Sequence, residues 1–201
     1  SCAVGYLARA DLGFPTMTEM TTWARYIASV VHIPVIADAD DGYGNALITM
    51  RTVEEYEKTG VAGIHIEDQR LPKRCGHLAG KVCLPLEESV KKLKAALDAR
   101  SDPDFFIIAR TDAENAVGGS LDEAIERSKR YADVGADMVW PEFATPDRGP
   151  VERFATEFRR AFPEVPMGFN YSSSFKWTEV ENPLTFRELG EEIDRCISPE
   201  G

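Results

Sequence analysis

The strongest constraint on the fold is a regular alternation of short apolar runs with longer amphipathic segments. The apolar runs, rich in β-branched residues, are Pro34–Ala39, Ala62–Glu67, Phe105–Arg110, Asp137–Trp140 and Val165–Asn170. Helical spacing of apolar residues predicts helices in Thr18–Val31, Val53–Thr59, Leu86–Asp98, Leu121–Val134, Val151–Ala161 and Pro183–Glu192. Because strands separated by helices form parallel βα units, the alternation predicts an α/β fold with a parallel sheet.

Two architectures share this alternation, the doubly wound sheet and the (β/α)8 barrel, and the pattern alone does not separate them. The 201 residues contain no linker and no low-complexity tract, so we expect one domain over residues 1–201. A complete barrel typically needs about 250 residues. If the fold is a barrel, we therefore expect it to be incomplete at one or both ends of this sequence.

The charge balance limits the classes of partner. The formal net charge is −11, from 34 acidic and 23 basic residues. This balance argues against nucleic acid, because phosphate binding depends on clustered Lys and Arg, and equally against an anionic membrane surface. The four cysteines are widely spaced, and no apolar run reaches the ~20 residues of a membrane helix. We therefore expect a cytoplasmic protein without a membrane partner.

Every predicted strand ends in, or is closely followed by, polar side chains. In chain order these are Asp38 and Asp40, His65 and Glu67, Arg110 and Asp112, Trp140 and Glu142, then Asn170, Ser172 and Ser174. Ligands of parallel α/β proteins bind at the carboxyl ends of the strands. Each residue alone has an alternative role as a loop polar group or helix cap. Their recurrence at all the strand ends indicates an active site.

A carboxylate cluster is predicted at the first two strand ends. Asp38, Asp40 and Glu67 would repel one another, and such repulsion is relieved by a shared proton or a bound cation. They offer only oxygen ligands, which suit Mg²⁺. A cation and a shared proton both remain open at this point.

The second concentration of functional groups is the basic segment from Lys73 to Lys81. Cys75 stands between Arg74 and a Gly-His pair, in surroundings that predict a thiol pKa below its usual range. The glycines of this segment indicate a mobile loop. Its basic residues Lys73, Arg74 and Lys81 would supply positive charge to hold a carboxylate substrate. The alternative is a flexible basic loop with an incidental cysteine.

These motifs carry a resemblance to a known family. Lys73-Arg74-Cys75-Gly76-His77 resembles the signature of isocitrate lyases and 2-methylisocitrate lyases. Three further segments, 38–45, 65–69 and 109–113, are similar to motifs of the wider phosphoenolpyruvate mutase/isocitrate lyase superfamily. The resemblance runs from Ser1 to about Trp177. It implies a (β/α)8 TIM-type barrel, a Mg²⁺-dependent carbon–carbon lyase and a homotetramer.

The resemblance also implies roles for individual residues. Asp38, Asp40 and Glu67 would bind Mg²⁺, with Mn²⁺ as an alternative. Cys75 would protonate the succinate carbanion, and Tyr43 is a candidate for the base that removes the hydroxyl proton. His77 and Arg110 would hold and polarise substrate carboxylates. The other substrate-binding residues implied are Ser1, Lys73, Arg74, Gly76, Glu142, Asn170, Ser172 and Ser174.

The segment 170–175 bears on the substrate. It resembles the isocitrate lyase stretch in which an asparagine and two alternate serines bind a carboxylate. We therefore expect a short-form isocitrate lyase that yields glyoxylate and succinate in the glyoxylate cycle. One departure is Cys2, which stands where the family's substrate loop has glycine. The alternatives are a lyase for 2-methylisocitrate or a related 2-hydroxy or 2-oxo diacid, and a subunit without activity.

Overall fold

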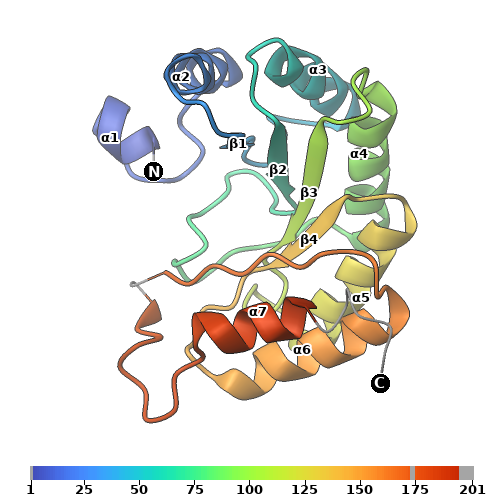
Figure 1. The fold of residues 1–201 in the computed structure, drawn as a ribbon. Helices are drawn as coiled ribbons and strands as arrows, with labels where there is room; N and C mark the ends of the chain where they lie inside the picture. The colour runs from blue at the N-terminus through green and yellow to red at the C-terminus, as the bar shows by residue number, and fades with distance from the viewer. Residues whose placement is uncertain (1, 173–174, 195–201) are drawn as a thin grey trace.

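The computed structural model describes residues 2–172 and 175–194, coloured along the chain in Figure 1. The helices are α1 (Cys2–Leu7), α2 (Met17–Val30), α3 (Ala46–Glu57), α4 (Leu86–Ala99), α5 (Leu121–Asp133), α6 (Arg148–Ala161) and α7 (Phe186–Asp194). The strands are β1 (Ile36–Asp38), β2 (Gly63–Glu67), β3 (Phe106–Thr111) and β4 (Met138–Pro141). Among the described residues, no helix is long and apolar enough to span a membrane.

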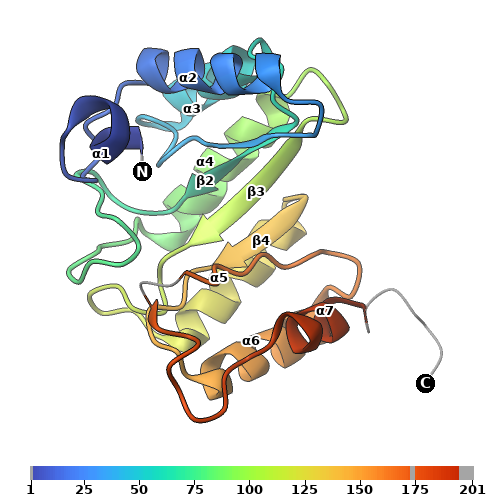
Figure 2. The same cartoon turned by 60° about the vertical axis from the view of Figure 1, so that its left-hand side comes forward.

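The strands form one parallel sheet in the order β1-β2-β3-β4. The connecting helices α3, α4 and α5 lie along the same face of this sheet (Figures 1 and 2). A doubly wound sheet reverses its strand order and carries helices on both faces, whereas a barrel keeps sequential order with helices outside. The winding is therefore that of a (β/α) barrel, and the described strands form an open arc of it.

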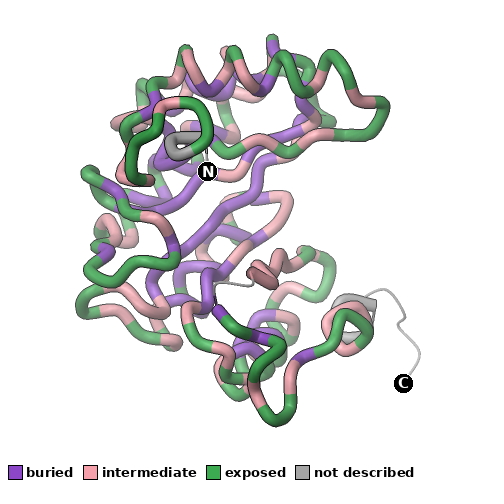
Figure 3. Tube along the Cα trace, turned by 90° about the vertical axis from the view of Figure 1, so that its left-hand side faces the viewer, coloured by how far each residue is buried: buried purple, intermediate pink, exposed green. Residues whose placement is uncertain are grey.

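The two faces of the sheet have different surroundings. Ile64, Ile107 and Val139 point toward the helices and are fully buried, and the buried residues follow the strands through the middle of the molecule (Figure 3). The alternate residues point to the other face, where Ile36 of β1 is 44% exposed. This exposure follows from the position of β1 at the edge of the described sheet.

The fifth apolar run does not form a strand. It meets β4 through an isolated bridge, in which Val139 N donates to Pro166 O (3.1 Å) and Gly168 N donates to Val139 O (2.8 Å). Pro166 has no N–H to give to a ladder, which limits the pairing. A second difference is the start of α3 at Ala46, earlier than predicted, because the Asn45 side chain caps the helix by accepting from Ile48 N (3.2 Å).

Candidate active site

The turn after β1 brings its carboxylates back to the end of the sheet. Asp40 O accepts from Glu67 N (2.9 Å), so the two residues are neighbours across the strand ends. The backbone of this turn is left-handed at Asp40 (φ 48°), Gly42 (φ 81°) and Tyr43 (φ 62°). Non-glycine residues in this region are strained, and such strain concentrates at functional sites. The turn has the geometry of a ligand-binding loop.

Lys73 lies within this carboxylate group. Its buried ammonium pairs with Asp40, with Asp11 (3.3 Å) and with Glu67 (3.9 Å). Burial and the charge of Asp38 raise the pKa of Asp40 to about 6, and burial raises the pKa of Glu67 well above its usual range. The sequence predicts that Lys73 binds a substrate carboxylate, but its charge is paired with carboxylates of the protein itself.

The fit of these donors to a divalent cation follows from their chemistry and their surroundings. Asp38, Asp40 and Glu67 offer oxygens only, and Oε1 of Glu67 is buried without a hydrogen-bond partner among the described residues. However, no three His, Cys, Asp or Glu side chains in the described part of the chain converge as a metal-binding group. Lys73 stands between Asp40 and Glu67. The donor chemistry fits Mg²⁺, and the Lys73 ammonium contacts two of the three donors.

Arg110, at the end of β3, contacts three of the carboxylates in the site. Its guanidinium donates to both oxygens of Asp112 (3.2 Å each) and lies 3.8 Å from Glu67 and 3.6 Å from Glu142. Glu142 also accepts from Asn170 Nδ2 (2.8 Å). Burial opposes the charge of Asp112, but Arg110 and Lys81 hold the pKa of its carboxyl below the usual range. The ends of β3 and β4 and the segment after them thus converge on one cation.

The cysteine loop packs directly on this cluster. A Cβ built on Gly76 would collide with the guanidinium of Arg110 and lie 2.9 Å from Oε1 of Glu142, so a larger residue would displace these side chains. The adjacent Cys75 is half-buried, and its N–H donates to Asp11 O (3.1 Å). Burial raises the pKa of the Cys75 thiol, despite the backbone N–H of His77 and the charge of Lys73. The predicted lowering of this pKa is wrong, and a thiol that keeps its proton is suited to proton donation.

Two residues predicted to act in the site, Tyr43 and Arg74, are engaged in contacts outside the Arg110 cluster. The Tyr43 hydroxyl bonds to that of Tyr56 (2.8 Å), which in turn donates to Asp38 O (2.7 Å). Burial raises the pKa of Tyr43, and this placement disfavours it as the hydroxyl base. Arg74 is exposed and donates to Ala79 O (3.2 Å), so its guanidinium lies on the outside of the loop.

The remaining predicted residues belong to the flanks of the site. His77 is exposed, with its ring 4.3 Å from that of Phe175. Ser172 follows Asn170 along the chain, and its carbonyl accepts from Phe175 N (3.1 Å). Ser1 and Ser174, both predicted to bind substrate, lie outside the described residues.

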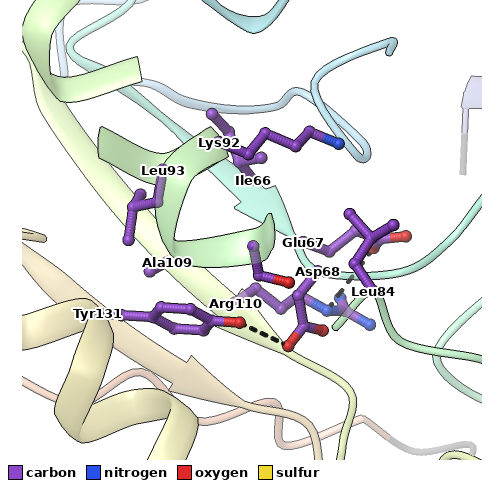
Figure 4. Close-up of a pocket in the computed structure, with 10 residues that line it drawn as sticks. Ile66, Glu67, Asp68, Leu84, Lys92, Leu93, Ala109, Arg110 and Tyr131 are labelled. Carbon is purple, nitrogen blue, oxygen red and sulfur yellow. Dashed lines mark hydrogen bonds and ion pairs between the residues drawn. The ribbon is translucent and has the colours of Figure 1, made fainter. Parts of the chain in front are cut away.

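Sequence reasoning missed a buried network behind the site. Asp68 accepts from Thr111 Oγ1 (2.7 Å), Tyr131 OH (2.8 Å) and Arg127 Nη1 (3.2 Å). Figure 4 shows the Tyr131 hydroxyl directed at Asp68 in a small cavity between the sheet and helices α4 and α5. Because Asp68 immediately follows Glu67, the two-residue period of a strand sends its side chain to the helix side. That period was the signal available in the sequence.

The raised pKa of Asp40 predicts a pH dependence of stability. The pKa of Asp40 is raised from 3.8 in the unfolded chain to about 6 in the folded protein. Its protonated carboxyl therefore stabilises the fold fully below pH 3.8, and this stabilisation is lost as pH rises through about 6. With divalent metal removed by chelator, the wild type should lose up to roughly 3 kcal/mol of stability relative to Asp40→Asn as pH rises from below 3.8 to above about 6. Urea unfolding across this pH range measures the difference. The exposed Asp133→Asn on α5 controls for one lost charge, and equal pH profiles for wild type and Asp40→Asn would contradict the prediction.

Known proteins resemble the chain over most of its length. The phosphoenolpyruvate phosphomutase family profile matches residues 3–182. The chain belongs to this family. The isocitrate lyase of Haloferax volcanii is 47% identical over 95% of the chain, and the 2-methylisocitrate lyase of Aeropyrum pernix 42% identical over 94%. The chain spans 55% and 58% of the length of these two relatives.

Solved structures of the phosphoenolpyruvate phosphomutase family show the same fold. The phosphoenolpyruvate phosphomutase of Streptomyces platensis subsp. rosaceus superposes with a TM-score of 0.82 at 35% identity, covering 92% of this chain and 61% of that one. A phosphonopyruvate hydrolase in complex with oxalate and Mg²⁺ superposes with a TM-score of 0.71 at 25% identity, covering 96% and 82%. The resemblance found in the motifs is confirmed, and with it the barrel-type fold.

Proposed function

We propose that this chain carries the active site of a Mg²⁺-dependent lyase that cleaves isocitrate to glyoxylate and succinate. The observation that carries the proposal is the docking of the cysteine loop. Gly76, the residue after Cys75, packs against Arg110 and Glu142 at the ends of β3 and β4, and the thiol of Cys75 is half-buried with a raised pKa. A protonated thiol next to a fixed guanidinium is the arrangement that a carbanion-forming cleavage of a carboxylate substrate requires.

The reaction is a retro-aldol cleavage. The hydroxyl proton leaves, the carbon–oxygen double bond of glyoxylate forms, and the carbon–carbon bond breaks with its electron pair left on the succinate carbon. The Sγ–H of Cys75 then gives its proton to that carbon. Arg110 holds a substrate carboxylate, and the loop around Gly76 excludes water from the cluster. We leave the hydroxyl base unassigned, because the Tyr43 hydroxyl is bonded to Tyr56.

Asp38, Asp40 and Glu67 are the residues that would hold the cation. A bound Mg²⁺ supplies electrostatic stabilisation of the alkoxide and the glyoxylate carboxylate. The oxygen-only donors and the Oε1 of Glu67, which has no hydrogen-bond partner among the described residues, support this assignment. The structure of the phosphonopyruvate hydrolase, described with oxalate and Mg²⁺, supports it within the family.

Cleavage of 2-methylisocitrate is the second candidate, since a 2-methylisocitrate lyase is almost as similar to the chain as the isocitrate lyase. Isocitrate is favoured by the resemblance of segment 170–175 to the isocitrate lyase stretch that binds a carboxylate. Cytoplasmic location and a tetramer stay predictions.

The test offers each substrate separately to the purified protein, with Mg²⁺ or with chelator. We expect glyoxylate from isocitrate, and a rate at least about a hundredfold lower in chelator, because the metal contributes several kcal/mol of charge stabilisation. Glyoxylate is measured as its phenylhydrazone, and pyruvate with lactate dehydrogenase. Pyruvate from 2-methylisocitrate with no glyoxylate from isocitrate would favour the second candidate. No cleavage of either substrate would favour an inactive subunit.

A further inference from the structure

We infer that Lys81 is a positioning residue that fixes Cys75 in the site through a buried ion pair with Asp112. The inference rests on the proposed function for its catalytic meaning, but its structural part stands on contacts alone. It replaces the expectation that Lys81 presents its charge to a substrate.

The Lys81 side chain is fully buried and has two partners. Its ammonium donates to Asp112 Oδ1 (3.0 Å) and to the carbonyl of Gly76 (2.6 Å), and both carboxylate and ammonium are shielded from solvent. A short charge-assisted hydrogen bond in a dry site is among the stronger non-covalent links in a protein. Lys81 therefore fixes the backbone immediately after Cys75 to the end of β3.

The backbone immediately before Cys75 is fixed in the same way. Gln69 donates from Nε2 to Arg74 O (2.8 Å) and accepts at Oε1 from Arg74 N (2.8 Å). The same Nε2 lies 3.1 Å from Asp112 Oδ2. The residues on either side of Cys75 are thus tied to one carboxylate, Gly76 through Lys81 and Arg74 through Gln69.

Asp112 joins these ties to the substrate side of the site. Each of its oxygens also accepts from Arg110, at 3.2 Å. The carboxylate therefore sets the place of the proposed acid and the place of the proposed substrate-binding guanidinium together. Positioning of this kind matters because small displacements of a reacting group cost large factors in rate.

The experiment measures the accessibility of Cys75 in Lys81→Met. This variant keeps a side chain of similar length and leaves Asp112 paired with Arg110, so no buried charge is left without a partner. Iodoacetamide alkylation is followed at fixed pH by peptide mass spectrometry, which distinguishes Cys75 from Cys83. We expect Cys75 to react at least about tenfold faster in the variant, because local opening of the loop becomes more frequent.

Lys92→Met is the matched control. Lys92 is also buried and also pairs with an aspartate, Asp41 (3.3 Å), but it lies on α4 on the helix side of the sheet. We expect its Cys75 to react within about twofold of the wild-type rate, since opening of the loop does not involve that pair. A wild-type rate in Lys81→Met, or an equal rise in Lys92→Met, overturns the inference. If Lys81→Met does not fold, Gln69→Ala removes the other tie without changing charge and is judged by the same criterion.

Turnover provides a second readout. Lys81→Met should lower kcat for isocitrate more than it raises KM, because the displaced group acts in the transition state rather than in binding. Alkylation of Cys75 can be measured in a protein without activity. The positioning role of Lys81 can therefore be tested independently of the proposed isocitrate cleavage. A protein that cleaves nothing but shows the expected alkylation pattern retains the positioning role and loses the proposed function.

Discussion

Replacing Cys75 by serine is expected to lower kcat for isocitrate cleavage by about 10²–10⁴-fold, the usual contribution of a positioned general acid. Serine has nearly the same size, and its hydroxyl is a much weaker acid than a thiol. The fold should be unaffected, because the hydrogen bond from Cys75 to Asp11 O is made by the backbone N–H, which serine keeps. Steady-state kinetics with a glyoxylate assay measure the change.

The pH profile gives an independent check on the same residue. Burial raises the pKa of the Cys75 thiol, so it stays protonated at neutral pH and activity should fall as pH rises through that pKa. The variant should lose this alkaline limb. Cys83→Ser is the control, since the Cys83 thiol donates to Asp68 (3.4 Å) and a serine hydroxyl can do the same. Unchanged turnover in Cys75→Ser would exclude the thiol as the acid.

Replacing Arg127 by methionine is expected to lower the free energy of unfolding by about 3 kcal/mol, the lower end of the range for removing one partner of a buried ion pair. Arg127 donates to Asp68 (3.2 Å) and to Leu84 O (2.8 Å), and both charged side chains are buried. The lower end applies because Thr111 and Tyr131 still donate to the carboxylate in the variant. Urea unfolding at constant pH provides the measurement.

Arg153 offers a matched control on the neighbouring helix. It pairs with Glu157 (2.7 Å) and with Asp122, but its side chain is 50% exposed. Arg153→Met should therefore cost less than about 1 kcal/mol, as surface ion pairs usually do. An equal decrease in the free energy of unfolding in the two variants would show that the buried Arg127–Asp68 pair stabilises the protein no more than a surface ion pair does.

The features that depend on local pattern could be predicted from the sequence. The apolar runs of β2 and β3 and the polar groups at strand ends follow from residue type and spacing. The strand ends meet because parallel strands share one carboxyl edge, so the proximity of Glu67 and Arg110 follows from the order of strands and helices alone.

Other features depend on tertiary contacts that a pattern does not contain. Lys73 and Lys81 look alike in a basic loop, but both are buried, and each pairs with a different aspartate. The pKa of Cys75 follows its burial rather than its charged neighbours in sequence. The run around Pro166 has the composition of a strand, but only a bridge forms, since pairing depends on donors as well as on apolar side chains.

Two adjacent carboxylates at the end of β2 point to opposite faces of the sheet. Glu67 points toward the candidate site, and Asp68 points toward the helices. Insertion or deletion of a single residue ahead of them would exchange these faces. An aspartate would then enter the site, and a glutamate would be forced among Arg127 and Tyr131. The length of the short connection from α3 into β2 is therefore expected to be fixed.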